Sequence, residues 1–169
     1  WDSSLEANSA LSGAAVSLDS VLQRTSYTTA GPVNLAWDMG RGVLWVGGSR
    51  VANNSGDPDV GGGAVELASQ AAAVINGSVL AFNQAGFGAA LTLSGKATAN
   101  IFSSSLVANS ANCGGAVGLN GSVSLALGGR STLSDNTAVR GGVACDVTMD
   151  PATRRCTGPT RAWRALPGA

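Results

Sequence analysis

The aspartates are the residues of this chain best suited to catalysis, because the sequence contains no histidine. Without histidine, the usual base of nucleophilic triads and the commonest metal ligand are both missing. Pairs of carboxylates remain, and such pairs cleave glycosidic bonds in many hydrolases. The candidate acids are Asp57 with Asp59, Asp135, and Asp146 with Asp150. Each lies in a turn-like stretch, and none recurs as an acidic cluster, so we predict that the chain is not an enzyme.

Two tryptophans support a second hypothesis, a carbohydrate-binding or carbohydrate-cleaving (pectate-lyase-like) β-helix. Its site would lie in a lateral groove between the loop Asp57-Pro58-Asp59 and the aromatic side chains of Trp37 and Trp45. The alternative is that these tryptophans pack in the core or against an insertion.

No motif for a cofactor is present. The run Gly61-Gly62-Gly63 precedes a predicted strand rather than a helix, so it does not have the context of a phosphate-binding loop. The cysteine spacing fits no metal site, and the calcium-binding nonapeptide pattern is absent. We therefore expect neither cofactor nor metal.

Charge and hydropathy limit the partners. Ten basic and ten acidic residues give a formal net charge of zero, which does not favour nucleic acid. No apolar run is long enough to span a bilayer, and no signal-peptide pattern is present. Trp1 falls within the first repeat, so we expect the chain to be a piece of something longer. The expected partners are copies of itself, the rest of a longer chain, or cell-surface and matrix glycans.

Three cysteines allow one disulfide bond. Cys145 and Cys156 flank a turn-like stretch and are the candidate pair, whereas the role of Cys113 is open. A bond between Cys145 and Cys156 would staple the C-terminal end and indicate an oxidising compartment. The alternative is three unpaired buried thiols.

Three sequons mark candidate N-glycosylation sites at Asn53, Asn76 and Asn120. Glycans on outward-facing asparagines at these positions would fit a secreted protein.

An internal repeat must position all of these residues. In five places an apolar residue, preceded two residues earlier by Ser, is followed three residues later by Asn: Asn8, Asn54, Asn83, Asn109 and Asn136. Each copy is followed by a Gly-rich turn, whose principal glycines are Gly62, Gly63, Gly88, Gly114, Gly115, Gly141 and Gly142. From Asn83 onward the spacing is 26 and then 27 residues. A fixed period of this length is typical of a solenoid.

The content of one period predicts the fold. Each regular period holds three short apolar stretches, which indicates an all-β parallel β-helix with three strands per coil and about six coils of roughly 26 residues. We assign residues 1–148 to the repeats, with a degenerate coil and insertion at about 21–48 and a surface loop at 55–61. Residues 149–169 lack the period and are expected to be a cap, a linker or a tail.

The physics of stacking explains the motif. Strands of successive coils lie about 4.8 Å apart, so equivalent residues form ladders. Asn at a corner tolerates a left-handed backbone and passes hydrogen bonds along the ladder. Gly in the next turn permits positive φ and close approach of coils. We therefore expect the five ladder asparagines and the glycines to be structural.

The paired motifs resemble the FxxN and GGA[ILV] repeats of the polymorphic outer membrane protein family. The second form is literal at Gly62-Gly63-Ala64-Val65 and Gly114-Gly115-Ala116-Val117, whereas Leu or Val stands in place of the family's Phe. The resemblance covers about Ser3 to Val147. It implies a right-handed β-helix and an extracellular or cell-surface location.

These observations favour a non-catalytic structural or adhesive module. Because we recognise no cap before the first repeat, we also expect that copies can stack end to end into a fibre.

Overall fold

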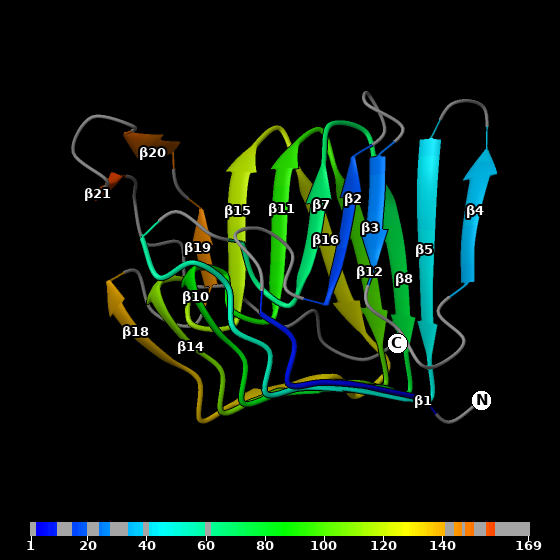
Figure 1. Ribbon diagram of the computed structural model, residues 1–169, viewed down its shortest axis with the longest axis horizontal. Helices are drawn as coiled ribbons and strands as arrows, with labels where there is room; N and C mark the ends of the chain where they lie inside the picture. Colours follow the sequence, from blue (N-terminus) through cyan, green and yellow to red (C-terminus); the bar gives the residue numbers. More distant parts are fainter. Residues whose placement is uncertain are drawn as a thin grey trace.

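The computed structural model describes residues 3–9, 15–19, 24–27, 34–38, 41–59, 62–140, 144–146, 148–150 and 155–157. All of the regular secondary structure in these ranges is β-strand, and the strands stack as successive coils (Figure 1). Strands of neighbouring coils pair in parallel. The prediction of an all-β parallel β-helix is confirmed.

Each regular coil contains four strands rather than the predicted three. One coil runs through β9 (Val79–Ala81), β10 (Gln84–Phe87), β11 (Leu91–Gly95) and β12 (Thr98–Phe102) before the next coil begins. The strand that the sequence analysis missed, here β10, fills the short interval between the ladder Asn and the Gly-rich turn. That interval is too short to show an alternating pattern.

The four strands of a coil belong to four sheets, which we call A to D in chain order. Sheet A contains β1 (Ser3–Glu6), β6 (Ser49–Ala52), β9, β13 (Ser105–Val107) and β17 (Thr132–Ser134). Sheet B contains β10, β14 (Ser110–Cys113) and β18 (Thr137–Arg140).

Sheets C and D form the other two sides. Sheet C contains β19 (Ala144–Asp146), β15 (Val117–Gly121), β11, β7 (Val65–Ala68), β2 (Val16–Asp19) and β3 (Arg24–Tyr27). Sheet D contains β16 (Ser124–Gly128), β12, β8 (Ala72–Asn76), β5 (Arg41–Gly47) and β4 (Asn34–Asp38).

The solenoid has fewer coils than the six expected. The five described strands of sheet A delimit four full turns. The difference arises within the range 21–48, where the described strands do not form a coil of their own. Instead β5 completes the first coil, and β3 and β4 are additional strands.

These two additional strands cap part of the N-terminal end. β3 pairs antiparallel with β2 at the edge of sheet C, and β4 pairs antiparallel with β5 at the edge of sheet D. The expectation that no cap precedes the first coil is therefore wrong for these two sheets. In sheet A, β1 is the terminal described strand.

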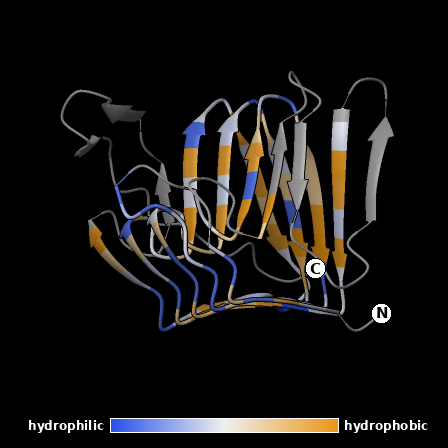
Figure 2. Cartoon of the chain, viewed as in Figure 1, coloured by the Kyte–Doolittle hydropathy of each residue, from blue (hydrophilic) through white to orange (hydrophobic). Residues whose placement is uncertain are grey.

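Inward-facing aliphatic side chains form a thin core. In sheet A the inner row is Leu5, Val51, Leu80, Leu106 and Leu133, one residue per coil. The first four are at most 2% exposed. Figure 2 shows hydrophobic bands recurring on the stacked strands, while hydrophilic residues gather at the turns.

The change of period from 26 to 27 residues has a local cause. Phe102 pairs with Gly128 at an offset of 26, whereas Ser105 pairs with Thr132 at an offset of 27. The extra residue lies at the corner between sheets D and A, where Gly129 and Arg130 both have positive φ. An insertion at a corner leaves the strand register intact on both sides.

The C-terminal part contains a short hairpin. β20 (Thr148–Asp150) pairs antiparallel with β21 (Arg155–Thr157). The rest of the segment 149–169, predicted to be a cap, linker or tail, lies outside the described residues.

Candidate functional site: ladders and outer faces

The five repeat asparagines form one hydrogen-bonded ladder at the corner between sheets A and B. In each step the side-chain Nδ2 of one Asn donates to the Oδ1 of the Asn in the next coil. These contacts measure 2.8 Å from Asn8 to Asn54, and 2.9 Å from Asn54 to Asn83, from Asn83 to Asn109 and from Asn109 to Asn136. The backbone N–H of each donor Asn reaches the same oxygen.

The ladder asparagines also donate hydrogen bonds to backbone carbonyls of the sheet A strand in the preceding coil. Asn83 Nδ2 donates to the carbonyl of Val51 at 3.1 Å, and Asn109 Nδ2 donates to that of Leu80 at 3.0 Å. An interior Asn thus accepts two bonds and donates two from its side chain. Asn54, Asn83 and Asn109 are at most 1% exposed, and burial of an amide at that depth is costly unless every polar atom is paired.

The left-handed residue of this corner precedes the Asn. The residues with positive φ are Ala7 (56°), Asn53 (55°), Phe82 (55°), Ala108 (52°) and Asp135 (55°). The expectation that the ladder Asn itself takes this conformation is therefore wrong. Side-chain identity at the left-handed position varies, so the sequence carried no signal for it.

The serines of the motif form a second row at the corner between sheets D and A. Ser49 N–H donates to Ser78 Oγ at 3.1 Å, and Ser78 N–H donates to Ser104 Oγ at 3.1 Å. The hydroxyls of Ser49, Ser78 and Ser104 each donate to a backbone carbonyl two residues earlier in the same coil. These three serines are structural, because their hydroxyls are buried and paired.

The glycines act in two ways. Gly88 and Gly114 have φ of 55° and 62°, a region that favours glycine. At Gly63 and Gly115 the reason is close approach, since a Cβ would collide with backbone carbonyl groups of Gly88 and Thr137, respectively. At Gly62 a Cβ would meet the side chain of Glu66. Gly141 and Gly142 lie outside the described residues.

The loop predicted at residues 55–61 covers the outside of sheet B. Asp57 Oδ1 accepts from the N–H of Asp59 at 2.7 Å, and the Asp57 carbonyl accepts from Gly86 N–H at 2.8 Å. Asn112 Nδ2 donates to the Pro58 carbonyl at 2.6 Å. The loop is therefore anchored to β10 and β14. Residues 60 and 61 lie outside the described part.

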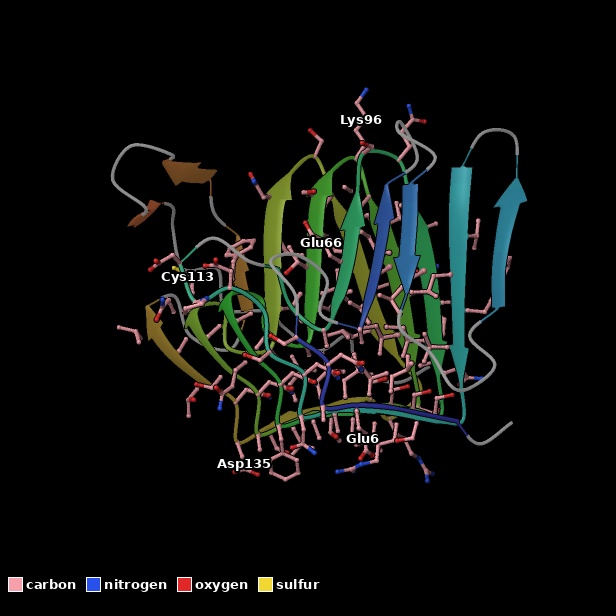
Figure 3. All side chains as sticks on the ribbon, in the orientation of Figure 1. Glu6, Glu66, Lys96, Cys113 and Asp135 are labelled. Atoms are coloured by element: carbon pink, nitrogen blue, oxygen red, sulfur yellow. The ribbon has the colours of Figure 1, made fainter. Side chains whose placement is uncertain are left out.

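The candidate acids are dispersed. Asp57 and Asp59 lie in this loop, whereas Asp135 lies at an exposed corner of the last described coil. Figure 3 shows Asp135 and Glu6 along the sheet A side, with Glu66 on sheet C. The side chains of Asp146 and Asp150 lie outside the described residues. Among the described residues, no group of three or more His, Cys, Asp or Glu is placed to hold a metal ion.

The candidate glycan groove is not assembled. Trp45 lies on the outer face of sheet D and is 42% exposed, whereas the Asp57-Pro58-Asp59 loop lies on sheet B. Sheets B and D occupy different sides of the solenoid (Figure 1). The side chain of Trp37 lies outside the described residues.

The outer face of sheet D instead carries its own aromatic residues. Trp45 is followed in its row by Val74 and Asn100, and Phe102, 41% exposed, lies one row away. The Phe102 ring covers Gly128 of the next strand, where a Cβ would come within 3.1 Å of the ring. The sequence analysis missed Phe102, although its place at alternating positions of a strand was the available signal.

The three sequon asparagines lie at or near strand ends: Asn53 follows β6, Asn76 ends β8, and Asn120 is the second-to-last residue of β15. Asn53 and Asn76 are exposed, and Asn120 is half-buried. Ser78, the third residue of the Asn76 sequon, is only 1% exposed because it belongs to the serine row.

The structure places Cys113 in a disulfide bond. Because the chain has three cysteines, a bond to Cys113 within one chain excludes the predicted pairing of Cys145 with Cys156. The side chains of Cys145 and Cys156 themselves lie outside the described residues. Cys113 ends a strand of sheet B that the sequence analysis did not recognise, so its position gave no hint of a partner.

One ion pair lies on the outer face of sheet A. Glu6 Oε1 accepts from Arg50 Nε at 2.9 Å between the first two coils. A hydrogen bond from Ser4 and the nearby Arg50 lower the pKa of Glu6 below its usual value. Both side chains are well exposed, so the pair contributes little to stability.

Comparison with known proteins gave no relative: no family model, curated protein or solved structure matches the chain. The resemblance to polymorphic outer membrane protein repeats stays a prediction. Within the described part of the chain, no helix has the length and apolar character needed to cross a membrane.

Proposed function

We propose that this chain is a non-catalytic structural or adhesive module of an extracellular or cell-surface protein. The proposal rests on one observation: the buried polar side chains form hydrogen bonds between coils. Asn54, Asn83 and Asn109 are fully committed to contacts between coils, and Ser78 and Ser104 likewise pair with neighbouring coils. The repeated motif is therefore explained by the stacking of coils, whereas the residue types on the outer surface are not constrained by it.

Two measurements test this role. Purified protein is incubated with a panel of polysaccharides, and the release of reducing or unsaturated ends is assayed. We expect no turnover, and turnover that disappears in an Asp57→Asn, Asp59→Asn double variant would contradict the proposal. In parallel, the protein immobilised on beads is presented to cells and to matrix, and we expect retention above that of an albumin-coated bead.

Two exposed sequon asparagines support the proposed location. Secretion of the chain from eukaryotic cells with an added leader would place the sequons before the glycosylation machinery. We expect glycans at Asn53 and Asn76, whose side chains are exposed. Peptide mass spectrometry with and without glycosidase treatment measures occupancy, and unmodified peptides at both sites would count against a glycoprotein.

A second candidate function, carbohydrate binding, rests on the outer face of sheet D. Trp45 and Phe102 present aromatic surface beside the polar Asn100, a combination that suits a sugar ring with one apolar face. Screening on a glycan array tests it, with Trp45→Ala as the disrupting variant. Phe82→Ala is the matched control, because Phe82 is an even more exposed aromatic residue but lies at the corner between sheets A and B. Equal binding by the two variants would end this candidate.

A further inference from the structure

The asparagine ladder has a direction, and within the described part of the chain its C-terminal end is open. Every ladder Asn before the last sends its backbone N–H and one Nδ2 hydrogen to the Oδ1 of the next coil. Asn136 accepts from Asn109 and donates its other Nδ2 hydrogen to the Leu106 carbonyl at 2.8 Å. Among the described residues, nothing accepts from the Asn136 backbone N–H or from its second Nδ2 hydrogen.

At the same end, one backbone carbonyl acceptor also lacks a donor among the described residues. The carbonyls of Leu5, Val51, Leu80 and Leu106 each accept from the ladder Asn of the following coil. Leu133 is the fifth member of this row, and no described side chain donates to its carbonyl. Two donors and one acceptor are therefore displayed in the geometry that one more Asn would match.

The described core is also less buried at this end. Leu125, Leu127 and Leu133 are only partly buried, whereas Ala99, Ile101 and Leu106 at the equivalent positions one coil earlier are at most 1% exposed. β17 is the terminal described strand of sheet A, so its outer backbone groups lack a strand partner there. A strand edge with this pattern is a template for addition of another strand.

Residues 137–169 offer no Asn that could extend the ladder, and the start of a second copy does not fit against its end. The sequence contains no Asn after Asn136. At the other end, β3 occupies the layer before the first coil of sheet C, while β19 occupies the layer of sheet C that follows β15. Head-to-tail stacking of two copies in ladder register would place β3 and β19 in one layer.

We propose that β17 binds an extended strand of a different polypeptide that carries an apolar residue followed three positions later by Asn. The strand pairs in parallel, with its apolar residue beside Leu133 and its Asn beside Asn136. The Asn Oδ1 then accepts the two open donors of Asn136, and its Nδ2 donates to the Leu133 carbonyl. This inference deepens the proposed structural role, on which it rests, by naming the partner of one end.

The motif Ser is not needed in that partner. Ser131 N–H, which would bond to the next Ser of the row, already donates to the Gly128 carbonyl at 3.2 Å. The turn closed by this bond contains the extra residue of the corner, together with the positive-φ residues Gly129 and Arg130. Recognition therefore depends on the apolar residue and the Asn.

The test uses the full chain and a synthetic peptide with the sequence of residues 104–112. We expect saturating peptide to slow hydrogen exchange at the Asn136 amide about tenfold or more, because the amide gains a bond and loses contact with water. A peptide with Asn109→Leu should bind about tenfold more weakly or worse, whereas one with Ser104→Ala should bind within about twofold of the parent.

Protein variants provide the matched control. Asn136→Asp removes the Nδ2 donors at the open end, and we expect a comparable loss of peptide affinity. Asn8→Asp makes the same change at the far end of the ladder and should leave peptide binding unchanged. Circular dichroism confirms that both variants fold. Equal affinity of the parent and Asn109→Leu peptides, or an Asn136 amide already protected in the free protein, would overturn the proposal. Either result would leave the bead-retention and turnover assays unaffected.

Discussion

Asn83 and Asn109 are 26 residues apart in sequence, yet the side-chain amide of Asn83 donates to Oδ1 of Asn109 at 2.9 Å, and both residues are completely buried. The same oxygen accepts the Asn83 backbone N–H at 3.1 Å. This contact joins two coils at the corner where no strand pairing operates. Its repetition along the solenoid makes it a principal source of order at that corner.

Removal of an interior ladder side chain should be severe. Asn83→Ala leaves two donors of Asn54 and the Val51 carbonyl without partners in a dry site, so we expect a loss of about 3 kcal/mol or more in the free energy of unfolding. Asn8→Ala, at the half-buried end of the ladder, should cost about 1 kcal/mol. Urea denaturation of both variants measures the difference, and equal losses would contradict the larger role argued for the buried interior of the ladder.

The left-handed corner offers a stabilising change. Ala108 has φ of 52°, so Ala108→Gly should relieve strain and raise the free energy of unfolding by about 0.5–1 kcal/mol. Ala108→Val should lower it by more than that, because a β-branched residue resists this conformation. Asn109→Gly tests the alternative placement of the left-handed residue: if this variant were the stabilising one, the assignment would be wrong.

Two glycines provide a matched pair for close approach. A Cβ at Gly63 would collide with the backbone of Gly88 and Ala89 in the next coil, whereas a Cβ at Gly47 meets nothing within 4 Å. We expect Gly63→Ala to lower the free energy of unfolding by about 3 kcal/mol and Gly47→Ala to change it by less than about 0.5 kcal/mol. Thermal unfolding of the two variants compares them directly, and similar midpoints would contradict the coil spacing.

The hydrogen bond from Ser4 to Glu6, together with the Arg50 ion pair, predicts a small acid-sensitive contribution to stability. Because the folded state lowers the Glu6 pKa from its usual 4.5, the contribution is present above that pH and is lost as pH falls through the folded value. Glu6→Gln should therefore be slightly less stable than the parent at pH 7 and indistinguishable from it at strongly acidic pH. Chemical denaturation across this range checks the sign. A gap that widened on acidification would be inconsistent with the lowered pKa.

The sequence was most informative where stacking imposes residue type. Equivalent positions such as Leu80 and Leu106 share one environment in successive coils, so the repeat predicted the parallel β-helix and its ladder correctly. It was least informative where backbone conformation alone matters. Phe82 and Ala108 share a left-handed conformation, yet their side chains have nothing in common.

Insertions explain the remaining errors. The residues between β2 and β5 had strand-like composition, but composition does not reveal that β3 and β4 run antiparallel and cap the end. Likewise, β10 and its equivalents were overlooked because a four-residue strand shows almost no alternation. The prediction of the candidate glycan groove was the least accurate. It grouped Trp45 and Asp57 by residue type, whereas Trp45 lies on sheet D and the Asp57 loop lies on sheet B.

Hydrogen exchange of the asparagine side chains tests the central claim most directly. The Nδ2 protons of Asn54, Asn83 and Asn109 are buried and bonded, whereas those of Asn53 and Asn76 are exposed. In a two-dimensional NMR spectrum recorded after transfer to D₂O, we expect the first group to persist after the second group has exchanged completely. Loss of all five side-chain signals at the same rate would contradict the ladder, and with it the stacked-coil account of this chain.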